Sequence, residues 1–120
     1  MDIKRITEIL EGEIICNPVQ DINITSACGA DLMSDVLAYF ESGFMLLTGL
    51  NKPQAVRTAE MADIKAIVFV RGKRPDITTI ELAREKGIPL VVTGLSMFES
   101  CGRLYTYGIK GLPPVCKLKR

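Results

Sequence analysis

The sequence predicts one α/β domain, with a mostly parallel sheet built from repeated strand–helix units and helices on both faces. Its 120 residues suit a single hydrophobic core. Three runs are almost wholly apolar, as strands buried on both faces are: Phe44–Leu47, Ala66–Val70 and Pro89–Val92. A glycine follows each run at nearly equal spacing, and the Thr-Gly-Leu of residues 48–50 returns unchanged at 93–95. Such repetition indicates parallel strands joined by helical crossovers.

The N-terminal third predicts two helices and two strands that complete the same sheet. Residues Ile3–Leu10 place their apolar side chains on one helical face, behind an aspartate that suits the N-cap. Glu13–Cys16 is predicted as a short strand, followed by an Asn-Pro turn. Asp21–Thr25 alternates between apolar and polar residues, which indicates a second strand. Apolar residues at helical spacing then predict a helix over about residues 33–40, closed by a Ser-Gly pair.

Further helices are predicted between and after the apolar runs, at Pro53–Ala62, Asp76–Lys86 and about Ser96–Tyr107. Prolines stand at or just before the first turn of two of them, where proline is well tolerated. No linker interrupts the chain, so we expect one domain at residues 1–109 and a basic C-terminal tail at residues 110–120. The tail should be extended, because Gly111–Pro114 cannot continue a helix.

The composition excludes several classes of function. Basic and acidic side chains number 15 and 14, and a formal net charge of +1 gives no global attraction for nucleic acid or an anionic membrane. Histidine is absent, which removes the commonest general base and any Ser-His-Asp triad. Neither Gly-x-x-x-x-Gly-Lys-Ser/Thr nor Gly-x-Gly-x-x-Gly occurs. We therefore predict no enzyme activity and no cofactor, with a phosphotransfer or acyl-transfer enzyme as the weaker alternative.

The cysteines and the hydropathy pattern predict a cytoplasmic protein without a bound metal. The four cysteines are scattered without Cys-x-x-Cys spacing, which excludes closely spaced zinc ligands. No apolar run reaches the length of a membrane span, and the N-terminus lacks the pattern of a signal peptide. We expect reduced thiols, with buried and inert side chains at Cys16, Cys28 and Cys101.

The loops that follow the three apolar runs share glycine, threonine and cationic residues. In an open α/β sheet, ligands bind outside the C-terminal ends of the strands. Glycine lets backbone amides approach a ligand, and each loop leads into a helix whose N-terminus favours anions. The sequence predicts an anion or nucleotide-phosphate site formed by Thr48, Gly49, Asn51, Lys52, Arg71, Gly72, Lys73, Thr93, Gly94 and Ser96. The alternative is that these residues only form turns, cap helices and carry solvated charges.

A second candidate site begins at the end of the small-residue segment Ser26–Asp31, a predicted loop that joins a strand to a helix. Asp31, Ser34 and Asp35 are expected in the first turns of a helix, with the two carboxylates four residues apart on one face. Such a pair could bind a cation or act as an acid–base pair. The alternative is that the acids only complement the helix dipole.

Several segments resemble the DRTGG domain family, and in particular its short stand-alone members. They are Ser26–Ala38, Val70–Pro75, Glu85–Thr93 and Phe98–Leu104, and the likeness extends to about Gly108. The same fold is similar to the N-terminal domain of HPr kinase/phosphorylase. The family's Asp-Arg pair falls on Asn51-Lys52 and its Thr-Gly-Gly on Val70-Arg71-Gly72. Gly72 alone keeps the eponymous residue, and Lys52 keeps the charge.

The resemblance implies an accessory or regulatory domain of the kind found beside CBS, acyl-transfer or kinase domains. We therefore expect a non-catalytic module that binds a small anionic ligand or nucleotide at the strand C-termini. The alternative is an interaction protein without a small ligand, a homodimer that docks on a metabolic or redox enzyme. A homodimer is expected because the helix faces are too apolar for a small monomer to hide, at Met33, Phe40, Phe98 and Tyr105.

Overall fold

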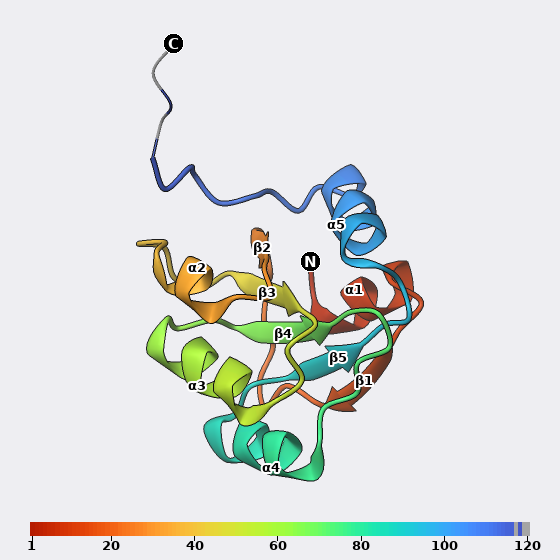
Figure 1. Ribbon diagram of the computed structural model, residues 1–120. Helices are drawn as coiled ribbons and strands as arrows, with labels where there is room; N and C mark the ends of the chain where they lie inside the picture. The colour runs from red at the N-terminus through yellow and green to blue at the C-terminus, as the bar shows by residue number, and fades with distance from the viewer. Residues whose placement is uncertain (117, 119–120) are drawn as a thin grey trace.

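Five strands form one sheet in the computed structural model, which describes residues 1–116 and 118 (Figure 1). Across the sheet the strands follow the order β1 (Glu13–Cys16), β5 (Leu90–Val92), β4 (Ala66–Phe69), β3 (Met45–Thr48) and β2 (Ala27–Gly29). Strands β2 to β5 run parallel, and β1 is antiparallel to β5. The mostly parallel sheet is confirmed, and the two N-terminal strands complete it at its opposite edges.

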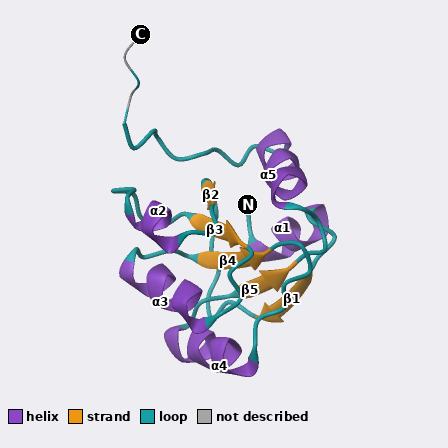
Figure 2. Ribbon diagram, in the orientation of Figure 1, coloured by secondary structure: helices purple, strands orange, loops and turns teal. Residues whose placement is uncertain are grey.

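Helices cover both faces of the sheet, as predicted (Figure 2). One face carries α2 (Met33–Leu37), α3 (Pro53–Met61) and α4 (Ile77–Lys86), and the other carries α1 (Ile3–Ile9) and α5 (Met97–Thr106). Side chains of Asp2, Asp76 and Ser96 cap the N-termini of α1, α4 and α5 by accepting a backbone N–H bond. None of the described helices is long and apolar enough to cross a membrane.

The strands serve two hydrophobic cores, because successive side chains of a strand point to opposite faces of the sheet. The strand side chains that pack against α2, α3 and α4 are Leu46, Ile67, Phe69, Leu90 and Val92. Those that pack against α1 and α5 are Met45, Leu47, Ala66, Val68 and Val91. Every residue of β3 and β4 is buried, which accounts for the uninterrupted apolar runs in the sequence.

Two predicted elements of the N-terminal third are wrong. Asp21–Thr25 forms no strand, although Ile24 is fully buried; the alternation reflects one-sided burial of an irregular segment. The strand is β2, which lies in the stretch predicted as a loop. Its Ala-Cys-Gly sequence has little strand propensity of its own, and pairing with β3 supplies the structure. The helix predicted to reach Phe40 ends at Leu37, and Phe40 is fully exposed.

The chain after α5 returns to the sheet at one position. The Lys110 amide donates to the Thr25 carbonyl at 3.0 Å, and the Ala27 amide donates to the Lys110 carbonyl at 2.9 Å. Beyond this bridge the chain passes over β2 and α2 (Figure 1), where Leu112 packs against the core and Val115 lines a hollow with Ala38 and Tyr39. The boundary at residue 109 stays a prediction, and Lys117, Lys119 and Arg120 of the predicted tail lie outside the described residues.

Candidate anion-binding site

The loops after β3, β4 and β5 meet at one edge of the sheet, because the three strands are parallel neighbours. The Arg71 amide donates to the Leu95 carbonyl, and the Gly72 amide donates to the Thr93 carbonyl, both at 2.8 Å. The Asn51 side-chain amide donates to the Arg74 carbonyl, also at 2.8 Å. The loops that the sequence singled out are therefore hydrogen-bonded to one another.

Asp31, which follows β2, joins this edge through both oxygens of its carboxylate. Oδ1 accepts a hydrogen bond from the Gly49 amide at 2.7 Å, and Oδ2 lies 3.2 Å from Nη2 of Arg71. The Gly49 hydrogen bond is the largest cause that lowers the pKa of Asp31, with further lowering by the Arg71 guanidinium and the Thr48 hydroxyl. Asp31, Gly49 and Arg71 are called the edge cluster below.

Glycine at position 49 leaves room for the Arg71 side chain, which lies against its α-carbon. A Cβ at this position would stand 1.9 Å from Nη2 of Arg71. Arg71 itself has φ +59, and Gly72 follows with φ +67, so two consecutive residues adopt the left-handed conformation. This turn directs the Arg71 side chain back over β3, where it meets Gly49 and Asp31.

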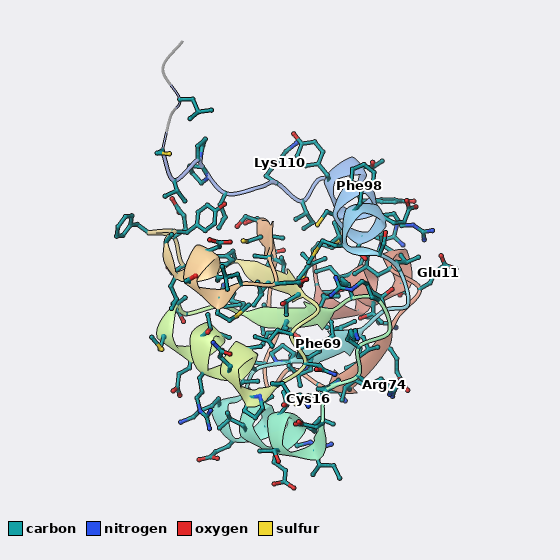
Figure 3. All side chains as sticks on the ribbon, viewed as in Figure 1. Glu11, Cys16, Phe69, Arg74, Phe98 and Lys110 are labelled. Carbon is teal, nitrogen blue, oxygen red and sulfur yellow. The ribbon has the colours of Figure 1, made fainter. Side chains whose placement is uncertain are left out.

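Two of the other cationic side chains at this edge form ion pairs with carboxylates. Lys52 lies 3.4 Å from Asp76, and Arg74, labelled in Figure 3, lies 2.7 Å from Glu13. Both ion pairs are exposed, and pairs of this kind stabilise a protein only weakly. Lys73 is exposed and has no ion-pair partner within residues 1–116 and 118.

Several residues predicted to bind a ligand also have a clear structural task. The buried Thr93 hydroxyl donates to the Leu10 carbonyl at 2.7 Å, and the Gly72 amide is occupied by the Thr93 carbonyl. Ser96 caps α5 by accepting from the Glu99 amide. Gly94 has open space where a side chain would begin. For Thr93 and Ser96 these contacts match the turn-forming and capping alternative.

The second candidate site differs from its prediction. Helix α2 begins at Met33, so Asp31 precedes it instead of lying in its first turn. The Asp31 carboxylate binds Gly49 and Arg71, whereas Ser34 and Asp35 are exposed residues of the short helix. Within the described part of the chain, no group of three or more Cys, Asp or Glu side chains could hold a metal ion. The cation and acid–base hypotheses for Asp31 and Asp35 stay predictions.

Three of the four thiols are shielded from solvent, and Cys116 is exposed. Cys16 and Cys28 are buried, Cys101 is half-buried, and burial raises the pKa of all three. A thiol with a raised pKa is a poor nucleophile at neutral pH. The prediction of a buried side chain is confirmed for Cys16 and Cys28 and is too strong for Cys101.

An apolar hollow of about 210 Å³ lies beside the edge cluster, between the ends of β2 and β3 and the helix α5. Gly29 and Leu47 line it, and each stands two residues before a member of the edge cluster. The remaining lining residues are Ala27, Cys101, Leu104, Tyr105, Ile109, Lys110 and Gly111. Its volume is below the roughly 300–1,000 Å³ of a drug-sized ligand site, so it suits one part of a ligand.

Sequence reasoning identified the members of the edge cluster but missed that they bind one another. Gly49 and Arg71 were assigned to an anion site and Asp31 to a different one. The available signal was the small-residue stretch before Asp31, which lets β2 lie against β3. Had residues 27–29 been predicted as a strand beside β3, Asp31 would have fallen at the same sheet edge as Gly49.

The fold and the sequence together define the class of protein: this is an α/β domain of the DRTGG domain family. Residues 5–106 match that family, and the chain belongs to it. The two places where the family motif falls are neighbours here, because the loop at Asn51 is hydrogen-bonded to the loop that follows Gly72. No curated protein matches the chain.

A solved structure has a similar fold: the CBS and DRTGG domains of the regulatory region of Clostridium perfringens pyrophosphatase, complexed with the activator diadenosine tetraphosphate. The two chains superpose with a TM-score of 0.67 and share 15% sequence identity. The match covers 90% of this chain and 50% of the other, so this chain spans half of that regulatory region. At this level of identity the likeness is one of fold.

Proposed function

We propose that this protein is a non-catalytic regulatory module that binds a small anionic ligand at the C-terminal ends of β2 to β4, with a nucleotide as the leading candidate. The observation that carries the proposal is the edge cluster. There, a backbone amide and a guanidinium already hold an anionic group, the carboxylate of Asp31. Hydrogen bonds with an ionised partner are the stronger ones in proteins, and arginine suits planar or phosphoryl oxygens.

The apolar hollow at β2 and β3 supports a ligand with an apolar or ring portion next to its anionic group. Gly29 and Leu47 line the hollow two residues before Asp31 and Gly49, so one small molecule that extends along the strands could touch both. The fold is similar to that of a regulatory region complexed with diadenosine tetraphosphate. That activator has both rings and anionic phosphates, so the likeness also supports a nucleotide.

The titratable groups at this edge favour binding over catalysis. A general base works best when its pKa lies near the working pH, whereas the pKa of Asp31 is lowered from an ordinary value of 3.8. The pKa of Asp76 is also lowered, chiefly by hydrogen bonds from Thr79. Carboxylates held in this way accept hydrogen bonds but take up protons poorly.

Calorimetric titration of the wild-type protein against nucleotides, phosphate and acyl phosphates tests the proposal. Arg71→Glu removes a favourable contact and adds a repulsive one, so affinity should fall about a hundredfold or more. Arg57→Glu is the matched control, because Arg57 on α3 is exposed and makes no ion pair among the described residues. It should leave affinity near the wild-type value. The assignment is wrong if no compound binds below millimolar concentration, or if Arg71→Glu and Arg57→Glu behave alike.

A second candidate function is a homodimeric interaction protein that docks on an enzyme without a small ligand. Large apolar side chains on α5 favour it: Phe98, labelled in Figure 3, is 87% exposed and Tyr105 is 62% exposed. Sedimentation at tens of micromolar should give a dimer mass for an affinity of roughly micromolar. Phe98→Ser should then give a monomer mass, and a monomer mass for the wild type would remove this candidate.

A further inference from the structure

The carboxylate of Asp31 lies where the anionic group of a ligand would bind. Its two oxygens accept hydrogen bonds from the Gly49 amide at 2.7 Å and from the Arg71 guanidinium at 3.2 Å. These two donors belong to the loops that follow two different strands. Since the Gly49 amide has a single N–H and Asp31 occupies it, an incoming anion reaches Gly49 and Arg71 together only when Asp31 leaves. The protein therefore carries an internal competitor for its own candidate site.

We propose that Asp31 determines specificity at this site, by admitting phosphoryl dianions and excluding carboxylate monoanions. This inference rests on the proposed function. A tethered carboxylate has a high effective concentration at its partners, so a free ligand of the same charge and shape gains nothing by replacing it. A phosphoryl group carries about −1.5 to −2 charges at neutral pH and a third acceptor oxygen, so it can replace a singly charged carboxylate.

The surroundings of Asp31 allow it to leave. Its side chain is 54% exposed, and it stands at a bend between β2 and the short helix α2. An exposed carboxylate released from Arg71 is solvated at once, so its departure carries no burial penalty. The backbone of Arg71 would stay in place, because its amide is bound to the Leu95 carbonyl at 2.8 Å.

The competing explanation is that Asp31 only positions Arg71 over Gly49. The two explanations predict opposite results for Asp31→Asn, which keeps the shape of the side chain and removes its charge. If Asp31 competes with the ligand, the substitution strengthens anion binding. If Asp31 only positions Arg71, the guanidinium is released and anion binding weakens.

The experiment compares wild type, Asp31→Asn and the matched control Asp35→Asn by calorimetry, with tripolyphosphate and acetate as probes. Asp35 lies in the adjacent helix and makes no ion pair within the described residues, so its substitution removes the same charge nearby. Tripolyphosphate should bind Asp31→Asn about tenfold more tightly or better, as for removal of a competing charge. Acetate should bind only Asp31→Asn, and Asp35→Asn should resemble the wild type.

A second measurement uses the wild-type chain and does not depend on how the variant folds. Carboxyl NMR follows the pKa of Asp31 with and without tripolyphosphate. Displacement from Gly49 and Arg71 should raise the pKa toward its ordinary value of 3.8 or above it, whereas a purely positioning Asp31 keeps its low pKa.

The outcomes separate the two proposals. If wild type binds tripolyphosphate, and Asp31→Asn binds it equally or more weakly while the pKa of Asp31 stays low, the competition is disproved and the anion site stands. If neither wild type nor Asp31→Asn binds tripolyphosphate below millimolar concentration, the anion site itself is wrong, and the inference falls with it.

Discussion

Two turns in this protein have the same sequence and the same local structure, yet only one lies in the candidate site. Thr48-Gly49-Leu50 follows β3, and Thr93-Gly94-Leu95 follows β5. In each, the threonine hydroxyl accepts a hydrogen bond from the leucine amide, at 3.1 Å and 3.2 Å. The local sequence therefore determines the turn in both places.

The surroundings of the two glycines differ completely. The Gly49 amide donates to Asp31 and Arg71 covers its α-carbon, whereas a Cβ at Gly94 would meet nothing within 4 Å. The cause is strand order. Strand β3 lies between two parallel strands, and the residues beyond their ends reach its loop. Strand β5 instead borders the antiparallel β1, which brings its first residue, Glu13, to this edge. The repeated tripeptide makes a turn in both places, and its neighbours distinguish the candidate anion site from the other turn.

Between the two turns, the largest expected effect is on ligand affinity, and it separates the two glycines directly. In Gly49→Ala the new methyl group displaces the Arg71 guanidinium, because the space is already filled. Affinity for tripolyphosphate should fall about tenfold or more, as for the loss of a charge-assisted hydrogen bond. Gly94→Ala should leave affinity unchanged, since its methyl group enters open space. Calorimetry of both variants checks this, and equal affinities would end the distinction between the two turns.

The two threonines should show the reverse order in stability. The Thr93 hydroxyl donates to the buried Leu10 carbonyl, which Thr93→Val would leave unpaired. We expect Thr93→Val to lower the free energy of unfolding by about 1–3 kcal/mol. Thr48→Val should cost about 1 kcal/mol, because the turn bond to Leu50 is the main loss. Urea denaturation measures both, and a larger cost for Thr48→Val would contradict this account.

The smallest expected effect is the dependence of stability on acid. The pKa of Asp31 is lowered in the folded protein, so its stabilising contribution is present above the ordinary value of 3.8 and is lost as pH falls through the folded pKa. Asp31→Asn should therefore be less stable than wild type at neutral pH, by a small amount because the group is exposed. The difference should shrink below pH 3.8, and a constant difference would show that charge is not its origin.

Much of the fold could be predicted because β3, β4 and β5 are buried on both faces. Such strands appear in the sequence as uninterrupted apolar runs, and two of the helices have capping residues, Asp76 and Gly87 at α4 and Ser96 at α5. Strand β2 could not be found in the same way. Its residues pair with β3 but are too small to form an apolar run, so tertiary pairing alone makes them a strand.

The candidate site was predictable as a set of loops but not as a set of contacts. Parallel strands bring their C-terminal ends together by rule, which placed Gly49, Arg71 and Gly94 at one edge. Which of them meets a charge depends on the left-handed backbone at Arg71 and on the position of Asp31 beyond an unrecognised strand. The backbone at Arg71 leaves no pattern in the sequence, and the strand before Asp31 is marked only by its small residues.

An amide NMR titration of the wild-type protein with tripolyphosphate tests the central claim most directly, because Gly49 and Gly94 serve as site and control within one molecule. We expect the NMR signals of the Gly49 amide and the Arg71 side-chain Nε–H to shift together and saturate, while the signal of the Gly94 amide does not shift. No saturable shift at Gly49, or equal shifts at Gly49 and Gly94, would contradict an anion site at the edge cluster.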